Sequence, residues 1–273
     1  MCATCGCGQA ETGRHAPEHG HEPIRLHDHH HAEADHSQRR LASAGSESHQ
    51  EARGGTIIEI EQALLAENDR HAAHNWGVFN RKHTRAFNFI SSPGAGKTTL
   101  LEKTLTALLA RQVACAVIEG DQATDLDARR IARTGVPVFQ IETGRSCHLD
   151  ARQIQHALKH LDVPERGLFF IENVGNLICP TEFKLGEHER VTILSVAEGH
   201  DKPAKYPLAF RDATVVVISK IDLLPHVDFD LVEVRRLIKG LNPKVSIFEL
   251  SARTGDGMDA WLSWLQHRVQ VES

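Results

Sequence analysis

The chain has 273 residues, of which 41% are hydrophobic and 25% charged, and its formal net charge is −5 with histidine neutral. This composition is typical of a globular protein, and the negative charge argues against nucleic acid or an anionic membrane as the main partner. No apolar run approaches the length needed to span a bilayer, and the first residues lack the apolar segment of a secretory signal. We therefore expect a cytoplasmic protein whose six cysteines are thiols or metal ligands and not disulfides.

Residues 1–55 differ in composition from the rest of the chain. Apolar residues are sparse there, and no spacing of a helix or strand recurs, so the segment cannot bury enough apolar surface to offset its ordering entropy. We expect a largely disordered extension that precedes a folded domain over residues 56–273. Nine of the 19 histidines lie in the extension: His15, His19, His21, His27, His29, His30, His31, His36 and His49. They could hold divalent ions as a reservoir, or form an ordinary solvated tract.

Three cysteines at the start of the chain form a candidate metal site. Cys2, Cys5 and Cys7 offer three soft ligands within six residues, and Gly6 permits the tight turn between them. A terminal amine or a backbone nitrogen as the fourth ligand would give a square-planar site, which favours Ni²⁺ or Cu²⁺. Tetrahedral Zn²⁺ is the rival.

From residue 56 onward, strand and helix patterns alternate. Ile57, Ile60, Leu64 and Leu65 predict a helix from residue 56 to about 74. Apolar runs predict strands at 87–91, 115–119, 136–141, 168–172, 191–196, 214–219 and 245–250. Helical spacing predicts helices at 97–110, 125–134, 149–161, 228–240 and 257–267. Alternation of this kind predicts an α/β fold with a mostly parallel seven-stranded sheet flanked by helices, and ligand loops at the carboxyl ends of its strands.

The stretch Ser91-Ser92-Pro93-Gly94-Ala95-Gly96-Lys97-Thr98-Thr99 follows the first strand and leads into a helix. Backbone N–H groups of such a loop and the start of the helix bind phosphates, and the lysine adds a charge for the outer phosphates. The pattern G-x-x-x-x-G-K-[ST] has Ser91 at its first position. The stretch therefore predicts a P-loop NTPase in which Gly94, Ala95, Gly96, Lys97, Thr98 and Thr99 bind nucleotide.

Two later loops indicate which base is bound. Ser219-Lys220-Ile221-Asp222 ends a strand and is similar to N-K-x-D, with serine at the asparagine position. An aspartate there accepts from two donors on the guanine edge that adenine lacks. Ser251 and Ala252 follow the next strand, where GTPases carry a Ser-Ala loop. We therefore expect GTP and GDP as ligands, bound by Lys220, Asp222, Ser251 and Ala252.

Carboxylates at two strand ends are candidates for the cation and for catalysis. Glu172 ends an apolar strand in the place of a Walker B acid, and Asp121 ends another. With the Thr98 hydroxyl, these two predict an Mg²⁺ site. Lys97, Asp121, Glu172 and Asp127 are the candidate catalytic residues. Asp127 either orients the attacking water or is an ordinary acid at a helix start.

Cys147, His148 and Cys179 form a second candidate metal site. Cys147 and His148 follow one strand end, and Cys179 lies seven residues beyond Glu172, so the three are expected at the rim that binds nucleotide. Two thiolates and an imidazole suit Zn²⁺ or Ni²⁺. A site attached to a switch loop would be remodelled when GTP is hydrolysed. Cys115, inside a strand, is expected to be a small buried residue.

The chain resembles the HypB family of hydrogenase nickel-incorporation GTPases over nearly its whole length. The shared motifs are the N-terminal Cys-x-x-Cys-Gly-Cys, the His-rich segment, Ser-Ser-Pro-Gly-Ala-Gly-Lys-Thr-Thr, Glu-Gly-Asp-Gln, Thr-Gly-Arg-Ser-Cys-His-Leu-Asp, Ile-Glu-Asn-Val-Gly-Asn-Leu-Ile-Cys-Pro and Asp-Lys-Pro-Ala-Lys-Tyr-Pro. The resemblance implies a GTPase that delivers Ni²⁺ to the large subunit of [NiFe]-hydrogenase during maturation. It also implies a GTP-promoted homodimer, with the Cys147, His148 and Cys179 site near the interface, and a nickel-metallochaperone partner of the HypA type.

These motifs lead to a hypothesis and a rival. In the hypothesis, GTP and Mg²⁺ fix the loops of Asp121 and Glu172, and hydrolysis loosens the metal site next to them. Hydrolysis is expected to be slow, because the sequence places no arginine or glutamine on the γ-phosphate. In the rival, the protein stores metal and its GTPase fold is mainly a scaffold for dimerisation.

Overall fold

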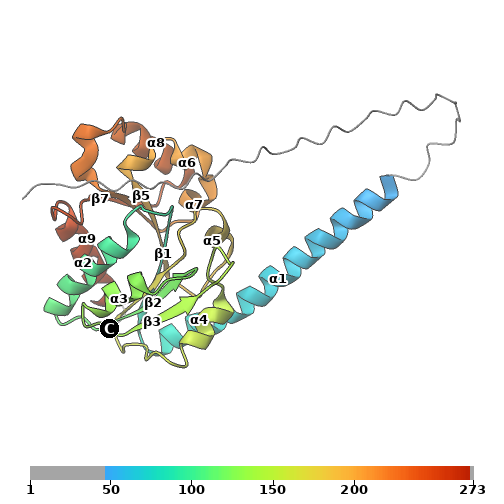
Figure 1. Ribbon diagram of the computed structural model, residues 1–273, viewed down its shortest axis with the longest axis horizontal. Helices are drawn as coiled ribbons and strands as arrows, with labels where there is room; N and C mark the ends of the chain where they lie inside the picture. Colours follow the sequence, from blue (N-terminus) through green and yellow to red (C-terminus); the bar gives the residue numbers. More distant parts are fainter. Residues whose placement is uncertain (1–46, 271–273) are drawn as a thin grey trace, which may run out of the picture. The chain divides into compact units, whose positions relative to one another are not determined.

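A computed structural model describes residues 47–270, and within this range all seven expected strands are present. They pair in the order β3-β2-β4-β1-β5-β6-β7, with every strand pairing parallel (Figure 1). The strand carrying the P-loop is therefore central. The bounds are β1 Arg85–Ser91, β2 Cys115–Asp121, β3 Val138–Glu142, β4 Leu168–Glu172, β5 Glu189–Ser195, β6 Val215–Ser219 and β7 Ser246–Leu250.

The expected helices are also present, with ends that differ by a few residues. They are α1 Glu47–Arg81, α2 Lys97–Ala110, α3 Leu126–Ala132, α4 Ala151–Ala157, α8 Leu231–Leu241 and α9 Met258–Gln270. Three short helices and two 3₁₀ turns were not expected: α5 Cys179–Glu182, α6 Lys202–Lys205, α7 Pro207–Arg211, η1 Val196–Glu198 and η2 Ile221–His226. No helix within residues 47–270 is long and apolar enough to cross a membrane.

Helix α1 is longer than the predicted segment at both ends. It continues past residue 74 because Phe79 is fully buried against Phe169, with ring centroids 5.0 Å apart. At its other end, residues 47–55, which were expected to lack regular structure, belong to the helix. The expected disorder of residues 1–46 lies outside the described residues and stays a prediction.

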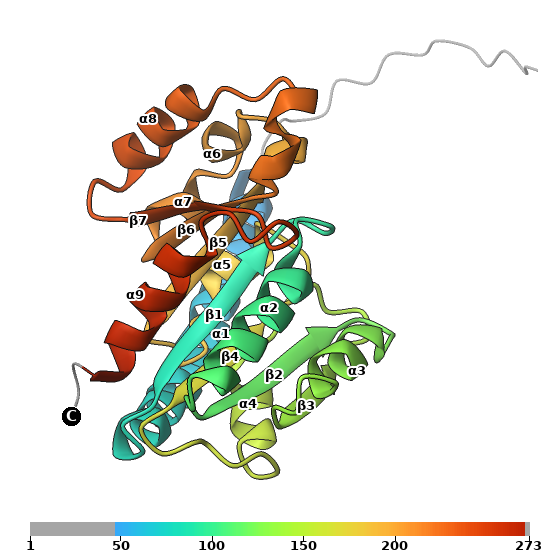
Figure 2. The ribbon, with the colours of Figure 1, turned by 90° about the vertical axis from the view of Figure 1, so that its left-hand side faces the viewer.

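Helices cover both faces of the sheet (Figure 2). On one face, α2, α3 and α9 pack on alternate residues of the strands, with Trp261 of α9 fully buried against Phe89 and Phe248. On the other face, α1 and α4 cover one half of the sheet, and α7 and α8 cover the other half. Because both faces are covered, the strands are nearly continuous apolar runs, and polar side chains are concentrated where the strands end.

Two asparagines attach α1 to the rest of the domain. Asn68 donates to the Lys184 carbonyl at 2.8 Å and accepts from the Ala151 N–H at 2.9 Å. Asn75, which is fully buried, donates to the carbonyls of Ala151 and Leu185 at 2.8 and 3.0 Å. Asn68 thereby accepts from an N–H at the start of α4 that has no partner within that helix, and both asparagines hold the segment after α5 through its carbonyls.

Replacement of Asn75 by alanine should destabilise the domain. The change leaves the Leu185 carbonyl without the Asn75 donor and removes the second donor to the Ala151 carbonyl, which still accepts within α4, so the free energy of unfolding should fall by about 1–3 kcal/mol. Chemical denaturation measures this difference. His74→Ala, at the exposed neighbouring position, is the matched control and should change stability by less than about 0.5 kcal/mol. Equal effects of the two substitutions would contradict this account of how α1 is held.

Candidate nucleotide and metal site

The P-loop connects β1 to α2 and forms one wall of a cavity of about 470 Å³ at the carboxyl ends of the strands. Gly96 has a φ of 100°, a conformation that turns the backbone into the helix and that side chains disfavour. The Lys97 ammonium donates to the Ser91 hydroxyl at 3.1 Å. Burial lowers the pKa of Lys97, and the carboxylates of Glu172 and Asp127 oppose that shift. The loop therefore presents backbone donors and one buried cation to a phosphate chain.

Two carboxylates face each other at the floor of this cavity. Glu119 of β2 and Glu172 of β4 are register partners, and they are only 2% and 3% exposed. The Thr98 hydroxyl donates to Glu172 Oε1 at 2.6 Å, while Oε2 of each glutamate has no hydrogen-bond partner. Burial, together with Glu172 and other nearby carboxylates, raises the pKa of Glu119 to about 8. Burial raises the pKa of Glu172 to about 7.

These groups fit a hard divalent cation such as Mg²⁺. Glu119, Asp121 and Asp127 each place a carboxylate oxygen within 4.8 Å of the other two. Oxygen donors are the ligands that Mg²⁺ prefers, and the unpartnered buried oxygens of Glu119 and Glu172 are costly without a partner. Of the predicted cation ligands, Thr98 and Glu172 hydrogen-bond each other, and Asp121 lines the same cavity.

Asp121 and Asp127 have further roles in the loop that follows β2. Asp121 Oδ1 accepts from the N–H groups of Ala123 and Thr124 at 2.9 and 3.0 Å, which closes a tight turn. Asp127 lies in the first turn of α3 and accepts from Arg130 at 3.1 Å. Asp127 therefore lies at a helix start, as one of the two alternatives has it, and it also lines the phosphate cavity, so its role toward the attacking water stays a prediction.

Several residues of this cavity were not among the predicted site residues, and Glu119, Gln122 and Arg130 are the ones whose side chains bear most on its charge and hydrogen bonding. Glu119 was overlooked because it lies inside the β2 run, and only the pairing of β2 with β4 places it beside Glu172. Arg130 and Gln122 also line the cavity, although neither was a predicted site residue. Arg130 donates to Thr99 and Asp127, which line the same cavity, and to Glu102, and Gln122 donates to the Ser146 carbonyl at 3.3 Å.

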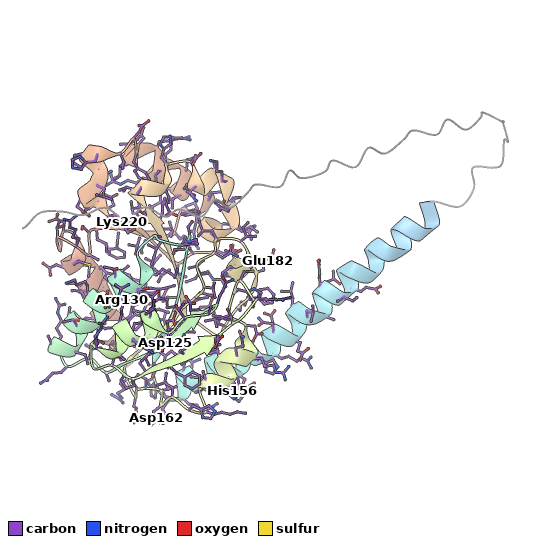
Figure 3. The ribbon with its side chains drawn as sticks, in the orientation of Figure 1. Asp125, Arg130, His156, Asp162, Glu182 and Lys220 are labelled. Atoms are coloured by element: carbon purple, nitrogen blue, oxygen red, sulfur yellow. The ribbon has the colours of Figure 1, made fainter. Side chains whose placement is uncertain are left out.

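A second cavity of about 220 Å³ adjoins the first and includes the residues predicted to bind the base. The Ser251 hydroxyl donates to Asp222 Oδ1 at 2.6 Å, which orients that carboxylate. The Lys220 ammonium donates to the Gly94 carbonyl at 2.6 Å. Three residues line both cavities: Gly96, Thr99 and Lys220. Figure 3 labels Lys220 and also Arg130, which lines the phosphate cavity. Ala252 lines the smaller cavity as well.

Ser219, which stands where the guanine motif has asparagine, links β6 to the P-loop. Its hydroxyl is buried and donates to the Ala95 carbonyl at 2.8 Å. A serine at this position therefore still holds the P-loop against the strand that carries the base motif.

The structure brings Cys147, His148 and Cys179 together next to the phosphate cavity. Their ligand atoms lie within 4.8 Å of one another. Burial lowers the pKa of His148, which favours the neutral imidazole that binds metals. The Cys147 thiol raises the pKa of Cys179. The His148 ring stacks on Phe183, with centroids 4.1 Å apart.

Cys115 is buried in β2, as expected. Cys2, Cys5, Cys7 and the histidines of residues 1–46 lie outside the described residues.

Comparisons with known proteins identify the family of the chain. Residues 86–249 match the model of the CobW/HypB/UreG nucleotide-binding domain. The chain is 51% identical to the hydrogenase maturation factor HypB of Azotobacter vinelandii, over 78% of this chain and 70% of that protein. It is 38% identical to the HypB of Cupriavidus necator, over 97% of this chain and 88% of that one.

The chain belongs to the HypB family.

Solved structures support this assignment. The crystal structure of HypB from Helicobacter pylori in complex with nickel has a TM-score of 0.69 and 36% identity, and the match covers 75% of this chain and 95% of that one. The HypB of Archaeoglobus fulgidus has the same TM-score at 38% identity, with 75% and 100% covered. The family assignment and the sheet order together confirm the predicted P-loop NTPase fold. As a HypB-family protein, the chain is a hydrogenase maturation factor with a nucleotide-binding domain.

The raised pKa of Glu119 predicts how the stability of this HypB-family domain depends on pH. Its pKa in the folded protein, about 8, exceeds the ordinary value of 4.5, so the folded state keeps a proton that the unfolded state loses between these values. The resulting stability is complete below pH 4.5 and is lost as the pH rises toward 8. Without metal or nucleotide, the free energy of unfolding should fall over this window in the wild type by on the order of a few kcal/mol more than in Glu119→Gln.

Denaturation in EDTA at several pH values tests this expectation. Glu67→Gln changes an exposed glutamate on α1 and should leave the pH profile of the wild type unchanged. Parallel profiles for the wild type and Glu119→Gln would mean that Glu119 is ionised in the folded protein.

Proposed function

We propose that the protein is a GTPase that delivers Ni²⁺ to the large subunit of [NiFe]-hydrogenase during maturation. The observation that carries this proposal is the position of two sites at the same strand ends. Glu172, in the phosphate cavity, and Cys179, in the thiol and imidazole cluster, lie on one continuous segment. The relationship to hydrogenase maturation factors supports the biological role, and the likeness to a HypB crystallised with nickel supports the choice of metal.

In this proposal the two cavities together bind GTP or GDP. Asp222, oriented by Ser251, reads the guanine edge, and the P-loop with Lys97 binds the phosphates. Thr98, Glu119, Asp121 and Glu172 would hold Mg²⁺, which when bound neutralises charge on the phosphates. Asp127 orients the attacking water. Hydrolysis is slow, because Arg130 and Gln122, which line the phosphate cavity, are held in hydrogen bonds with protein groups.

The metal site changes with the nucleotide in this proposal. Cys147, His148 and Cys179 bind Ni²⁺, or Zn²⁺ as the competing ion, and loss of the γ-phosphate loosens the segment that carries Cys179. Cys2, Cys5 and Cys7 form a separate Ni²⁺ site, and the His-rich segment stores further nickel. The partners are a second copy of the chain in a GTP-promoted homodimer, a nickel metallochaperone of the HypA type and the hydrogenase large subunit, all in the cytoplasm.

Asp222→Asn should change which base is bound. An amide cannot accept from both guanine donors, so GDP should bind about 10²-fold more weakly or worse. Xanthine offers the complementary acceptor, so xanthosine diphosphate should bind more tightly to the variant than GDP does. Titration calorimetry with both nucleotides measures this exchange. The control is Asp228→Asn, an exposed carboxylate outside the cavity. Unchanged preference for GDP in Asp222→Asn would reject guanine recognition by this carboxylate.

Lys97→Ala distinguishes the GTPase from a metal store. In a strain whose [NiFe]-hydrogenase depends on this protein, Lys97→Ala should abolish maturation, because its GTP hydrolysis should fall about 10²-fold or more. Lys103→Ala, an exposed lysine on the same helix, should have no effect. If maturation persists in Lys97→Ala but is lost when the histidines of residues 15–49 are replaced, storage is the main role and the GTPase proposal fails.

A further inference from the structure

The loop that carries Cys147 and His148 is attached to the carboxylate-bearing end of β2. The Thr143 N–H donates to the Asp121 carbonyl at 2.8 Å. The Gln122 side chain donates to the Ser146 carbonyl at 3.3 Å, and the Ser146 hydroxyl in turn donates to the His148 carbonyl at 2.8 Å. The thiol and imidazole cluster is thus connected to β2 as well as to the segment after Glu172.

A single buried side chain contacts both segments that carry the cluster. Asn173 directly follows Glu172 and is 1% exposed. Its Oδ1 accepts from the N–H of Leu149, the residue after His148, at 3.0 Å. The same oxygen accepts from the N–H of Val174, which begins the segment leading to Cys179, also at 3.0 Å. Its Nδ2 donates to Asn88 Oδ1 on the central strand at 3.3 Å.

Leu149 makes the matching contact with the end of β2. Leu149 is fully buried, and a Cβ on Gly120 would lie only 2.7 Å from its Cδ1 and Cγ. The leucine side chain therefore packs directly on the backbone between Glu119 and Asp121. Leu149 lies between the two strand ends whose carboxylates face the phosphate cavity.

We infer that Asn173, together with Leu149, is a positioning pair that couples the nucleotide site to the Cys147, His148 and Cys179 cluster. The inference rests on the proposed function, because it assumes that the bound nucleotide affects metal binding. A shift of Glu172 moves Asn173, its neighbour in the chain. The N–H groups of Leu149 and Val174 follow, since a buried donor left without its acceptor is unfavourable. Both ligand-bearing segments are then displaced together.

The ratio of two nickel affinities tests this coupling. The full-length chain with Cys2, Cys5 and Cys7 replaced by alanine isolates the cluster. The Kd for Ni²⁺ is measured with GDP and with a non-hydrolysable GTP analogue, both in Mg²⁺. Allosteric coupling is typically about 5- to 150-fold, and we expect a wild-type ratio in this range. In Asn173→Ala the ratio should fall to within about 2-fold of one. By linkage, the effect of Ni²⁺ on nucleotide affinity should fall by the same factor.

Two further variants complete the experiment. Leu149→Ala leaves the acceptor on Asn173 and removes the side chain packed on Gly120, so its ratio should also fall even if Asn173→Ala does not fold. Asn242→Ala removes another asparagine whose amide holds backbone carbonyls, those of Arg211 and Ala213, away from both sites. It should retain the wild-type ratio.

The outcomes separate this inference from the proposed function. A wild-type ratio in Asn173→Ala or in Leu149→Ala, in folded protein, overturns the coupling by this pair and leaves the nucleotide-dependent switch standing. If the ratio also falls in Asn242→Ala, a general loss of stability explains the lower ratios of the other variants. This outcome overturns the coupling by Asn173 and Leu149 as well. If the two Kd values for Ni²⁺ are already equal in the chain that keeps Asn173 and Leu149, the nucleotide-dependent switch and this inference are both overturned.

Discussion

The hydrogen bond from Thr98 to Glu172 is the contact on which the rest of the site depends. It joins the first turn of α2, directly after the P-loop, to the last residue of β4. The bond therefore fixes the position of the phosphate loop relative to the candidate cation ligands. The bond is possible because β4 pairs with β1 in parallel, so that both strands end at the same edge of the sheet. The same pairing rule places Glu119 next to Glu172, and burial together with the Glu172 carboxylate then raises the pKa of Glu119.

Much of the fold was predictable from sequence because the strands are covered on both faces. A strand such as Leu168–Glu172 is a continuous apolar run that ends in one acid, and its predicted and observed bounds agree. Short helices escaped prediction because a helix of four residues, such as Cys179–Glu182, is too short to show a period. Its form depends on contacts from elsewhere in the chain: the Arg190 guanidinium donates to the Thr181 carbonyl at 2.7 Å.

The site was predictable where its residues are close in sequence and unpredictable where strand pairing brings them together. Lys97 and Thr98 belong to a contiguous motif, whereas Glu119 became recognisable only through its register with Glu172. The sequence departs from the known motifs at Ser91 in the P-loop and at Ser219 in the guanine motif. In both cases the serine hydroxyl makes a hydrogen bond with the P-loop. The Ser91 hydroxyl accepts from Lys97, and the Ser219 hydroxyl donates to the Ala95 carbonyl. Ser91 thus holds the lysine of the P-loop, and Ser219 joins the end of β6 to the loop. A comparison with the motif alone does not reveal either hydrogen bond.

The position of the thiol and imidazole cluster follows from the same sheet geometry. Parallel strands deliver every loop that follows them to one edge, so the loops after β2, β3 and β4 are neighbours although they are distant in sequence. Asp121 is the last residue of β2, Cys147 lies in the loop after β3, and Cys179 begins α5 at the end of the loop after β4. A change at the phosphate cavity is therefore only one or two hydrogen bonds away from the cluster, through Asn173 or through Thr143. No long pathway is needed to connect the proposed nucleotide and metal sites, because the carboxyl ends of adjacent strands carry the residues of both.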